Sequence, residues 1–501
     1  MIQHMSALFQ RHPLAISLIV AFIIRAVAAW RNYGPFAVDD YQNVIEPAMR
    51  YLMLGTKPEI PTLRFELLPY AFAWFMKPLY LLGVKRADFL VSFAYFVMGV
   101  ISLTQIVAMH RIGSLLLNET WRNAMTLFSA TWAIAPIFTN SADIAGPSYI
   151  LLTFCILHLI RATPEKFGLQ NSAAPGFMPF LWCGFYLSAA IFFRFSLAPL
   201  YFALAVWLLV VVHRGAKLRA VLYYALGGLL TAIIMVLLEL FNKKAPFSTA
   251  LEFIKYNLGA HIQTQSYGSM PWHLYLVIFL MFPLPLLSFF FWYPMFTAAR
   301  RYSALTTLFL TFLVSHSLIA FKLERYVIPV MPIFMLFLFA GMQQFADRRW
   351  LRWSYRILII LNALMILPVA LTMQQRAGVD GAIYAGRLEG TRIAHRIDPW
   401  RWAYYGFNRG NPAFTSTMEE LTTVIRAQPD SKLHIFRFMY FSKAELAQIE
   451  AAGMRCALKK IFRPDFLERI SIRLNPAMNG RRNDTTIYSC HPLKNDGTLQ
   501  H

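Results

Sequence analysis

Long apolar runs separated by short polar segments fill the first three quarters of the chain. A helix crosses the ~30 Å hydrocarbon core of a bilayer with about 20 mostly apolar residues. The pattern predicts about eleven spans, over residues 13–30, 88–109, 123–138, 147–161, 178–195, 196–212, 219–240, 272–296, 303–320, 327–345 and 355–373. We therefore expect an all-α polytopic membrane domain over residues 1–373, with a long first external loop over 31–87.

The first apolar run has some features of a secretory signal, because Arg11 precedes it and small residues lie near its end. However, Arg25 interrupts its apolar part. We interpret this run as a retained first span.

The tail over residues 374–501 has ordinary polar content and the periodicities of a soluble domain. Apolar alternation predicts strands over 432–436, 455–462 and 485–489, and a short helix over 443–452. We expect a small α/β domain outside the membrane.

Composition supports a membrane protein. Of the 501 residues 57% are hydrophobic and 14% charged, which is more apolar surface than a soluble domain hides. The net charge of +22 does not indicate nucleic acid, because the Lys and Arg residues lie in small groups between apolar runs. They are typical of topology signals and of contacts with anionic lipids.

The basic short loops predict the orientation. They all fall on one side of the predicted spans, which the positive-inside rule makes cytoplasmic: Arg111, Arg122, Arg161, Lys166, Arg214, Lys217, Arg219, Arg300, Arg301, Arg348, Arg349 and Arg352. The opposite side then holds the 31–87 loop, the 139–147, 241–271 and 321–326 connections and the tail. We expect the chemistry on this non-cytoplasmic side.

The four cysteines are too few for a disulfide scaffold, and their spacing is not that of a structural metal site. Cys456 and Cys490 lie on predicted strands of the external domain. An oxidising compartment would permit a disulfide between them, although the sequence leaves their geometry open.

Two adjacent acids, Asp39 and Asp40, lie where the first external loop leaves the membrane. An inverting glycosyltransferase needs one carboxylate to take the proton from the acceptor hydroxyl. Aspartate is also a favoured N-cap residue, so these acids could simply begin a helix that continues to about Met53. Both interpretations remain open at this stage.

The stretch from Val38 to Tyr51, with Asn43 and Glu46-Pro47, and the later Leu63-Arg64 resemble one known loop. It is the first luminal loop of the dolichol-phosphate-mannose-dependent α-mannosyltransferases of N-glycan and GPI-anchor assembly, which are GT-C superfamily glycosyltransferases. Three further blocks resemble the same family in the same order: Phe193-Arg194-Phe195-Ser196; Tyr256-Asn257-Leu258 with Tyr267 to Tyr275; and Ser315-His316-Ser317-Leu318 with Lys322, Arg325-Tyr326 and Pro329-Val330.

This resemblance implies a GT-C fold and an inverting transferase that moves mannose from a polyprenyl- or dolichyl-phosphate donor to a glycan or glycolipid acceptor. It implies Asp39 and Asp40 as the catalytic acids, with no cofactor required. A metal held by these two acids is not needed but not excluded. The chain departs from the family pattern at Asp40, Met270, Phe321 and Leu323, which leaves the donor sugar and the acceptor open.

Cations on the same side are candidates for binding the donor phosphate. The leaving phosphate gains negative charge, so a fixed cation beside it lowers the barrier. Lys322, Arg325 and Arg194 are the candidates, and Arg25 in the first span is a fourth. The alternative is that each is an interface residue whose charged end reaches water.

Candidate substrate-binding residues come from the same blocks, namely Glu46, Arg64, Tyr267, Trp272 and His273. An aromatic ring can stack on a sugar face, but Trp and His at the start of a span are also typical of an aromatic belt. Of the other polar residues, His316 is expected to form an interhelical hydrogen bond. Asp143 is expected to cap a helix or to support the site.

Two other function classes remain as alternatives. A transporter or flippase of lipid-linked sugars would show internal repeats, broken helices and ionisable groups near the membrane midplane, and none is evident in the sequence. A noncatalytic membrane relative would not need to retain the acids and the loop cations. The favoured location is a bacterial inner membrane with the site facing the periplasm; the alternative is the ER membrane with a luminal site.

Overall fold

The computed structural model describes residues 11–35, 40–55, 67–169, 176–212, 217–256, 269–281, 288–396, 413–474, 476 and 483–493. The chain divides into two compact units. The first unit comprises Met1–Val27, Glu59–Ala71 and Phe96–Leu367, and the second comprises Ala28–Pro58, Phe72–Tyr95 and Pro368–His501. The predicted division at residue 373 stays a prediction.

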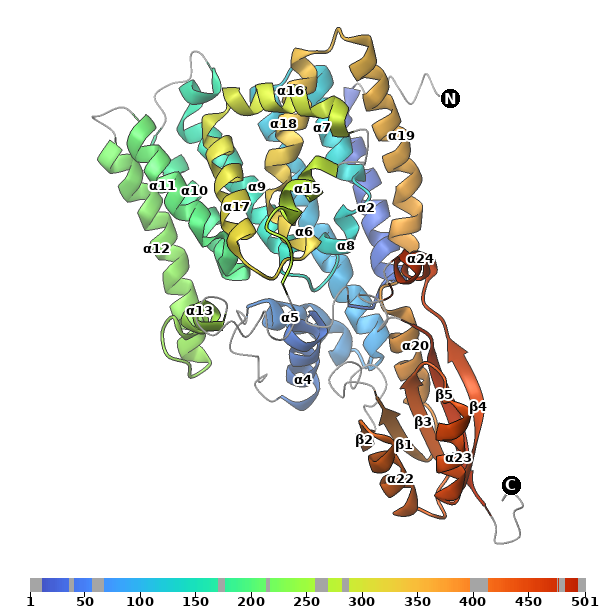
Figure 1. Ribbon diagram of the computed structural model, residues 1–501. Helices are drawn as coiled ribbons and strands as arrows, with labels where there is room; N and C mark the ends of the chain where they lie inside the picture. The colour runs from blue at the N-terminus through green and yellow to red at the C-terminus, as the bar shows by residue number, and fades with distance from the viewer. Residues whose placement is uncertain are drawn as a thin grey trace. The chain divides into compact units, whose positions relative to one another are not determined.

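Helices form most of the first unit (Figure 1). Their bounds, including those of helices shared with the second unit, are α2 Pro13–Arg31, α5 Leu67–Leu81, α6 Ala87–Leu116, α7 Glu119–Thr131, α8 Ala135–Thr139, α9 Ala145–Ala162, η2 Pro164–Phe167, α10 Met178–Phe193, η3 Phe195–Leu197, α11 Ala198–Val211, α12 Lys217–Phe241, α13 Ser248–Ile254, α15 Leu274–Met281, α16 Ser288–Arg301, α17 Ser303–Leu318, η5 Glu324–Val330, α18 Met331–Gln344 and α19 Arg349–Leu371.

Within the described ranges, six helical stretches are long and apolar enough to cross a membrane, and three shorter apolar helices accompany them. The number of eleven spans is not confirmed. The predicted run 123–138 holds two helices, because Trp132 leaves helical geometry after α7 and Pro136 lies in the first turn of α8. The run 272–296 likewise holds two helices, α15 and α16.

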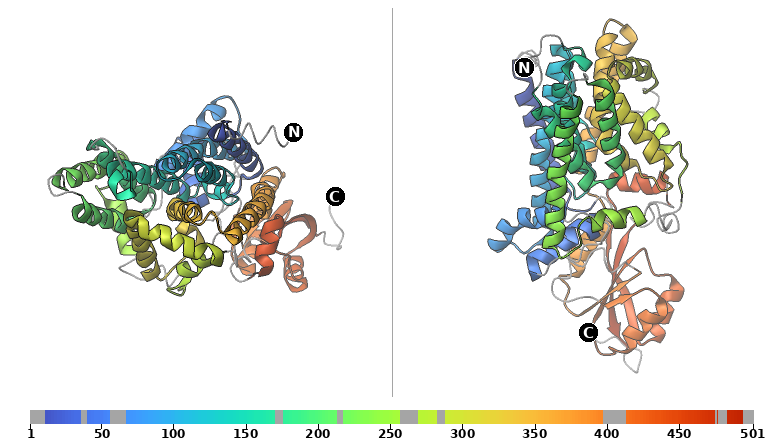
Figure 2. Two further views of the ribbon diagram at one scale, coloured as in Figure 1. Left: turned by 90° about the horizontal axis from the view of Figure 1, so that it is seen from above. Right: turned by 90° about the vertical axis from the view of Figure 1, so that its left-hand side faces the viewer.

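Glycines allow the closest helix packing in the first unit. Helix α10 packs against both α9 and α12 (Figures 1 and 2). A Cβ at Gly184 of α10 would lie 2.0 Å from the Tyr224 carbonyl oxygen, and one at Gly227 of α12 would lie 2.0 Å from the Leu181 carbonyl oxygen. Only glycine permits this approach, and small residues are typical of interfaces between membrane helices.

The second unit contains a five-stranded sheet of order β2-β1-β3-β5-β4. Its strands are β1 Thr391–His395, β2 Ala413–Thr415, β3 Leu433–Phe438, β4 Met454–Phe462 and β5 Thr485–Pro492. Strands β2, β1 and β3 are parallel, whereas β5 is antiparallel to both β3 and β4. The three predicted strands are confirmed as β3, β4 and β5, and β1 and β2 were not predicted.

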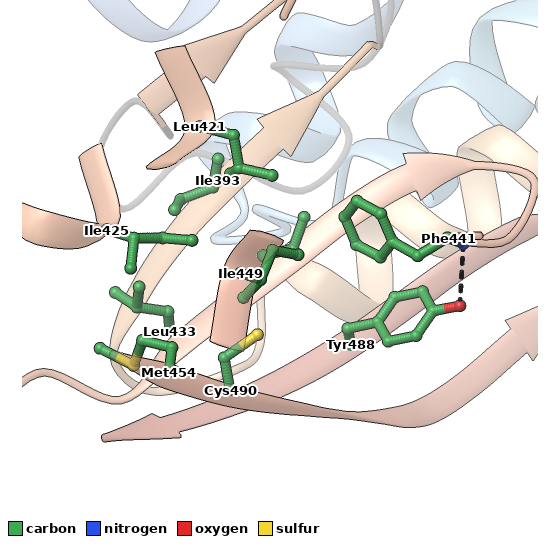
Figure 3. Packing of buried hydrophobic residues seen from close by; sticks show 10 residues of the cluster. Ile393, Leu421, Ile425, Leu433, Phe441, Ile449, Met454, Tyr488 and Cys490 are labelled. Atoms are coloured by element: carbon green, nitrogen blue, oxygen red, sulfur yellow. Dashed lines mark hydrogen bonds between the residues drawn. The ribbon is translucent and has the colours of Figure 1, made fainter. Parts of the chain in front are cut away.

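Helices cover both faces of this sheet. On one face lies α20, Arg376–Ala385, where Gly381 approaches the side chains of Phe436 and Thr485. On the other face α22, Met418–Arg426, and α23, Lys443–Ala451, enclose an apolar core (Figure 3). That core contains Ile393, Leu421, Ile425, Leu433, Ile435, Phe441, Ile449, Met454, Tyr488 and Cys490. The predicted helix 443–452 is confirmed as α23, and the α/β character of the tail is confirmed with it.

A disulfide joins Cys456 of β4 to Cys490 of β5, as hypothesised from the sequence. The two residues are directly opposite each other in the antiparallel register, with their Cα atoms 4.0 Å apart. The bond therefore fixes the register of the edge strand β4.

The ends of α2 and α19 meet in the second unit. The Gln374 amide donates to Asn32 Oδ1 at 3.2 Å, and Gln375 Nε2 donates to the Pro35 carbonyl at 3.4 Å. The Tyr33 hydroxyl donates to Asp380 Oδ1 at 2.6 Å. The start of the first external loop and the start of the tail therefore lie side by side in the second unit.

Candidate active site

The candidate residues form two groups, one in each unit. Asp40, in the second unit, is 5% exposed and precedes η1, a π-helical turn over Tyr41–Ile45. Its backbone is already helical, and its side chain makes no capping hydrogen bond. The capping interpretation therefore does not hold for Asp40. π-helical turns are rare overall, and those that occur are often found at functional sites. Asp39 and Arg64 lie outside the described residues.

Glu46 begins α4, Glu46–Leu54, the helix expected after the two acids. Its Oε1 accepts a hydrogen bond from Arg50 Nη2 at 2.7 Å, one helical turn further on. Burial raises the pKa of Glu46, and Arg50 opposes that rise. This carboxyl thus lies buried on the same short helix that follows Asp40.

Three cations of the first unit, Arg194, Lys322 and Arg325, belong to or contact one short segment, residues 322–326, and we call them the cation cluster. Arg325 is 7% exposed, and its Nη1 donates to Asp143 Oδ2 at 3.4 Å. The other oxygen of Asp143 accepts the Ala145 amide at 2.6 Å, at the start of α9. Asp143 therefore accepts the first backbone amide of α9, from a position just before the N-cap Ile144, and also fixes the guanidinium of Arg325.

Arg194 follows α10, where the backbone leaves the helix before η3. Its guanidinium carbon lies 4.2 Å from the centroid of the Tyr326 ring, which is a cation–π contact. Tyr326 is the residue that follows Arg325 in the chain. Two residues along, Ser196 Oγ lies 3.0 Å from His316 Nε2 of α17. The expected interhelical hydrogen bond of His316 is thus present, and it brings the second and fourth sequence blocks together.

Lys322 lies in the short connection between α17 and η5 and is 2% exposed. Its Nζ donates to the carbonyls of Ile319 and Met270. Burial lowers the pKa of Lys322. An ammonium has three donors, so these two carbonyls hold Lys322 in place and leave one donor for a ligand.

Arg25 has a different environment within the first unit. Its Nε donates to Ser102 Oγ at 2.6 Å, and its Nη1 donates to the Ala21 and Ala130 carbonyls at 3.4 and 3.3 Å. The Arg25 carbonyl in turn accepts from Asn140 Nδ2 at 2.7 Å. These contacts tie α2 to α6, α7 and α8, and they account for a buried arginine without a ligand.

The aromatic candidates at the start of α15 are exposed. Trp272 is 69% exposed, and its ring meets the His273 ring edge to face at 5.6 Å. Both the sugar-binding and the aromatic-belt interpretations fit this geometry. Tyr267 lies outside the described residues. Within the described part of the chain, no group of three or more His, Cys, Asp or Glu side chains could hold a metal ion.

Several residues that shape the cation cluster were not assigned to it from the sequence. Asp143 was interpreted mainly as a cap, and its pairing with Arg325 crosses 182 positions. Tyr326 and Tyr275 were quoted only as motif letters, yet the first stacks on Arg194 and the second accepts the Leu323 amide at 3.3 Å. The available signal was that Tyr326 belongs to the block that holds Lys322 and Arg325, and that Tyr275 belongs to the block before it.

The comparisons with known proteins agree with this geometry. The sequence model of the Alg9-like mannosyltransferase family matches residues 15–385. The crystal structure of ArnT from Cupriavidus metallidurans bound to undecaprenyl phosphate is similar in fold, with a TM-score of 0.57 and 13% identity over 95% of this chain and 97% of that chain. The apo structure of the same protein gives 0.56 and 14% over 97% and 98%. At such identities the likeness concerns the fold, which is that of the GT-C glycosyltransferases.

A comparison with curated protein sequences found no match. The family model nevertheless spans Asp39, Asp40 and the whole cation cluster, and it covers well over half of the 501 residues. The resemblance inferred from the four sequence blocks is confirmed. The chain belongs to the Alg9-like mannosyltransferase family.

Proposed function

We propose that this chain transfers mannose from a polyprenyl-phosphate donor to a glycan or glycolipid acceptor on the non-cytoplasmic face of its membrane. The observation that carries the proposal is the cation cluster, three cationic side chains held by α10, α17 and η5 in a helical membrane protein of a mannosyltransferase family. The similar ArnT structure was solved with undecaprenyl phosphate, which supports a lipid phosphate as the leaving group.

The reaction is a direct displacement at the anomeric carbon. Asp39 takes the proton of the acceptor hydroxyl, whose oxygen bonds to C1 of the sugar. The bond from C1 to the phosphate oxygen breaks, and that oxygen leaves with the electron pair as polyprenyl phosphate. Lys322, Arg325 and Arg194 offset the charge that develops on it. A β-linked donor gives an α-linked product.

Asp40 and Glu46 orient the loop and the acceptor, and Trp272 and His273 contact the sugar. No metal is required, because the cationic side chains supply the electrostatic stabilisation. The buried, non-capping carboxyl of Asp40 supports a role in the site rather than in helix initiation.

We expect Lys322→Gln to weaken donor binding by roughly 10–100-fold, because a hydrogen bond to a charged group contributes about 1.5–3 kcal/mol. Since burial lowers the pKa of Lys322, donor binding to the native chain should weaken with rising pH earlier than it would for an exposed lysine. Titration of purified protein with polyprenyl-phosphate mannose measures both effects. Lys166→Gln, at an exposed lysine of the predicted cytoplasmic side, is the control. Equal affinities for the two variants would remove Lys322 from the donor site.

The same preparation separates a transferase from a flippase. A transferase releases free polyprenyl phosphate in detergent and forms an α-mannoside when the acceptor is present. A flippase moves the intact donor across vesicles and releases none. Donor movement without release would overturn the proposed function.

The sidedness has its own test. The Cys456–Cys490 disulfide supports a non-cytoplasmic tail, because such bonds persist in oxidising compartments. We expect protease added to sealed spheroplasts to cleave within residues 374–501. Protection of the tail until the cells are lysed would reverse the topology.

A further inference from the structure

Helix α24, Phe466–Leu474, has an exposed face that the proposed reaction does not use. Phe466, Ile470 and Leu474 are 57%, 40% and 82% exposed and follow each other at four-residue spacing. This spacing places them in one stripe along the helix. Arg469 and Arg473 are also exposed and lie along one edge of that stripe.

The opposite face of α24 is anchored by two carboxylates. Glu468 is 2% exposed and accepts the backbone amides of Gln375 at 2.6 Å and Arg376 at 3.3 Å. Just before the helix, Asp465 Oδ2 accepts the Met373 amide at 3.0 Å. These contacts fix both the position of the helix and the direction in which its apolar stripe faces.

The anchoring residues lie directly after a candidate membrane helix. Met373, Gln375 and Arg376 immediately follow α19, a long apolar helix that ends at Leu371. Four residues reach at most about 14 Å, so the Gln375 amide lies within that distance of the helix end. The Gln374 amide is bound by Asn32, the first residue after α2. Two membrane-type helices therefore end beside the residues that hold α24 (Figure 1).

We infer that α24 lies in the plane of the membrane surface, with its apolar stripe among the lipid acyl chains and its two arginines on anionic headgroups. A short helix with apolar residues on one side and arginines beside them is typical of interfacial binding. Anionic lipid attracts such arginines electrostatically. The inference does not depend on the proposed function.

Site-directed spin labelling of the full chain in proteoliposomes tests the inference. A label at Ile470→Cys should lie roughly 5–10 Å into the boundary between headgroups and acyl chains. It should collide more often with oxygen than with a water-soluble nickel complex. The matched control is Gln448→Cys, at an exposed position of α23, where the nickel complex should be favoured. Near-ultraviolet circular dichroism and retention of the Cys456–Cys490 disulfide confirm that both variants are folded.

Lipid composition tests the arginines. In vesicles containing phosphatidylglycerol the label at position 470 should lie deeper than in pure phosphatidylcholine, and Arg469→Gln with Arg473→Gln should remove this difference. A label at 470 that behaves like the one at 448 would overturn the inference. So would a label shielded from both relaxing agents, because that result would indicate a protein partner or a second copy on this face.

Discussion

Asp39→Asn should lower the turnover number by roughly 10²-fold or more, while donor binding survives. Asparagine keeps the size of aspartate and part of its hydrogen bonding, but it cannot accept the proton of the acceptor hydroxyl. Under the proposed function, donor affinity depends instead on the cation cluster. Turnover and donor affinity should be measured on the same folded preparation.

Two further variants, compared with Asp39→Asn, allow that result to be interpreted. Asp40→Asn should do less harm if Asp40 orients the loop, and Glu46→Gln tests the buried carboxyl that pairs with Arg50. A capping role for Asp39 predicts the opposite outcome, because asparagine caps a helix about as well as aspartate. Near-normal turnover by the Asp39→Asn protein would therefore remove Asp39 from the catalytic role.

Arg325→Gln should destabilise the membrane domain by about 3–5 kcal/mol, because it leaves the Asp143 carboxylate buried without its cation. Asp143 is 0% exposed and has no access to water that could compensate. Asp143→Asn should also destabilise the domain, because it removes the carboxylate that pairs with Arg325 at 3.4 Å. Thermal unfolding in detergent measures both. Arg122→Gln, which breaks an exposed pair with Glu119, should change stability by less than about 1 kcal/mol.

The double variant Arg325→Gln with Asp143→Asn distinguishes a structural role of Arg325 from a role in the transfer reaction. Two amides of similar size leave no buried charge, so the pair should be more stable than either single variant. Its transfer activity should nevertheless stay low, because the positive charge of Arg325 is gone. Recovery of activity along with stability would show that Arg325 acts only as a structural partner of Asp143.

The sequence predicted the elements that depend on local patterns. Apolar runs locate the helices because the bilayer imposes a minimum length. The residue pattern of the tail likewise located β3, β4 and β5. Strands β1 and β2 were missed. The three residues of β2 are too few for a period to be evident, and the two apolar residues of β1, Ile393 and Ala394, are adjacent and do not alternate.

The break at Trp132 shows a second limit. Residues 123–138 contain no charged residue, so hydropathy does not reveal that α7 ends at Thr131. There Asn362 Nδ2 donates to the Thr131 carbonyl, and the Ala133 amide donates to Asn362 Oδ1. A side chain more than 200 positions away thus satisfies the backbone groups that the break leaves unpaired.

The candidate site also has a part that the sequence predicted and a part that only the tertiary fold shows. Motif order identified Arg194, Lys322 and Arg325, but not the partners that fix them. The ring of Tyr326, the carboxylate of Asp143 and the carbonyl of Met270 reach these cations only through the tertiary fold. For Arg25, the fourth phosphate-binding candidate, the partners that the fold supplies are Ser102 and two backbone carbonyls.

The contacts between the end of α2 and the start of the tail also constrain the order of folding. Asn32 and Gln374 are 342 positions apart, and Tyr33 and Asp380 are 347 apart. At about 5–20 residues per second, the ribosome needs roughly 20–70 s to make the intervening chain. Asn32 and Tyr33, which follow the first span, are thus synthesised long before their hydrogen-bond partners Gln374 and Asp380. Closure of this junction is therefore a late step, which can follow only the insertion of α19.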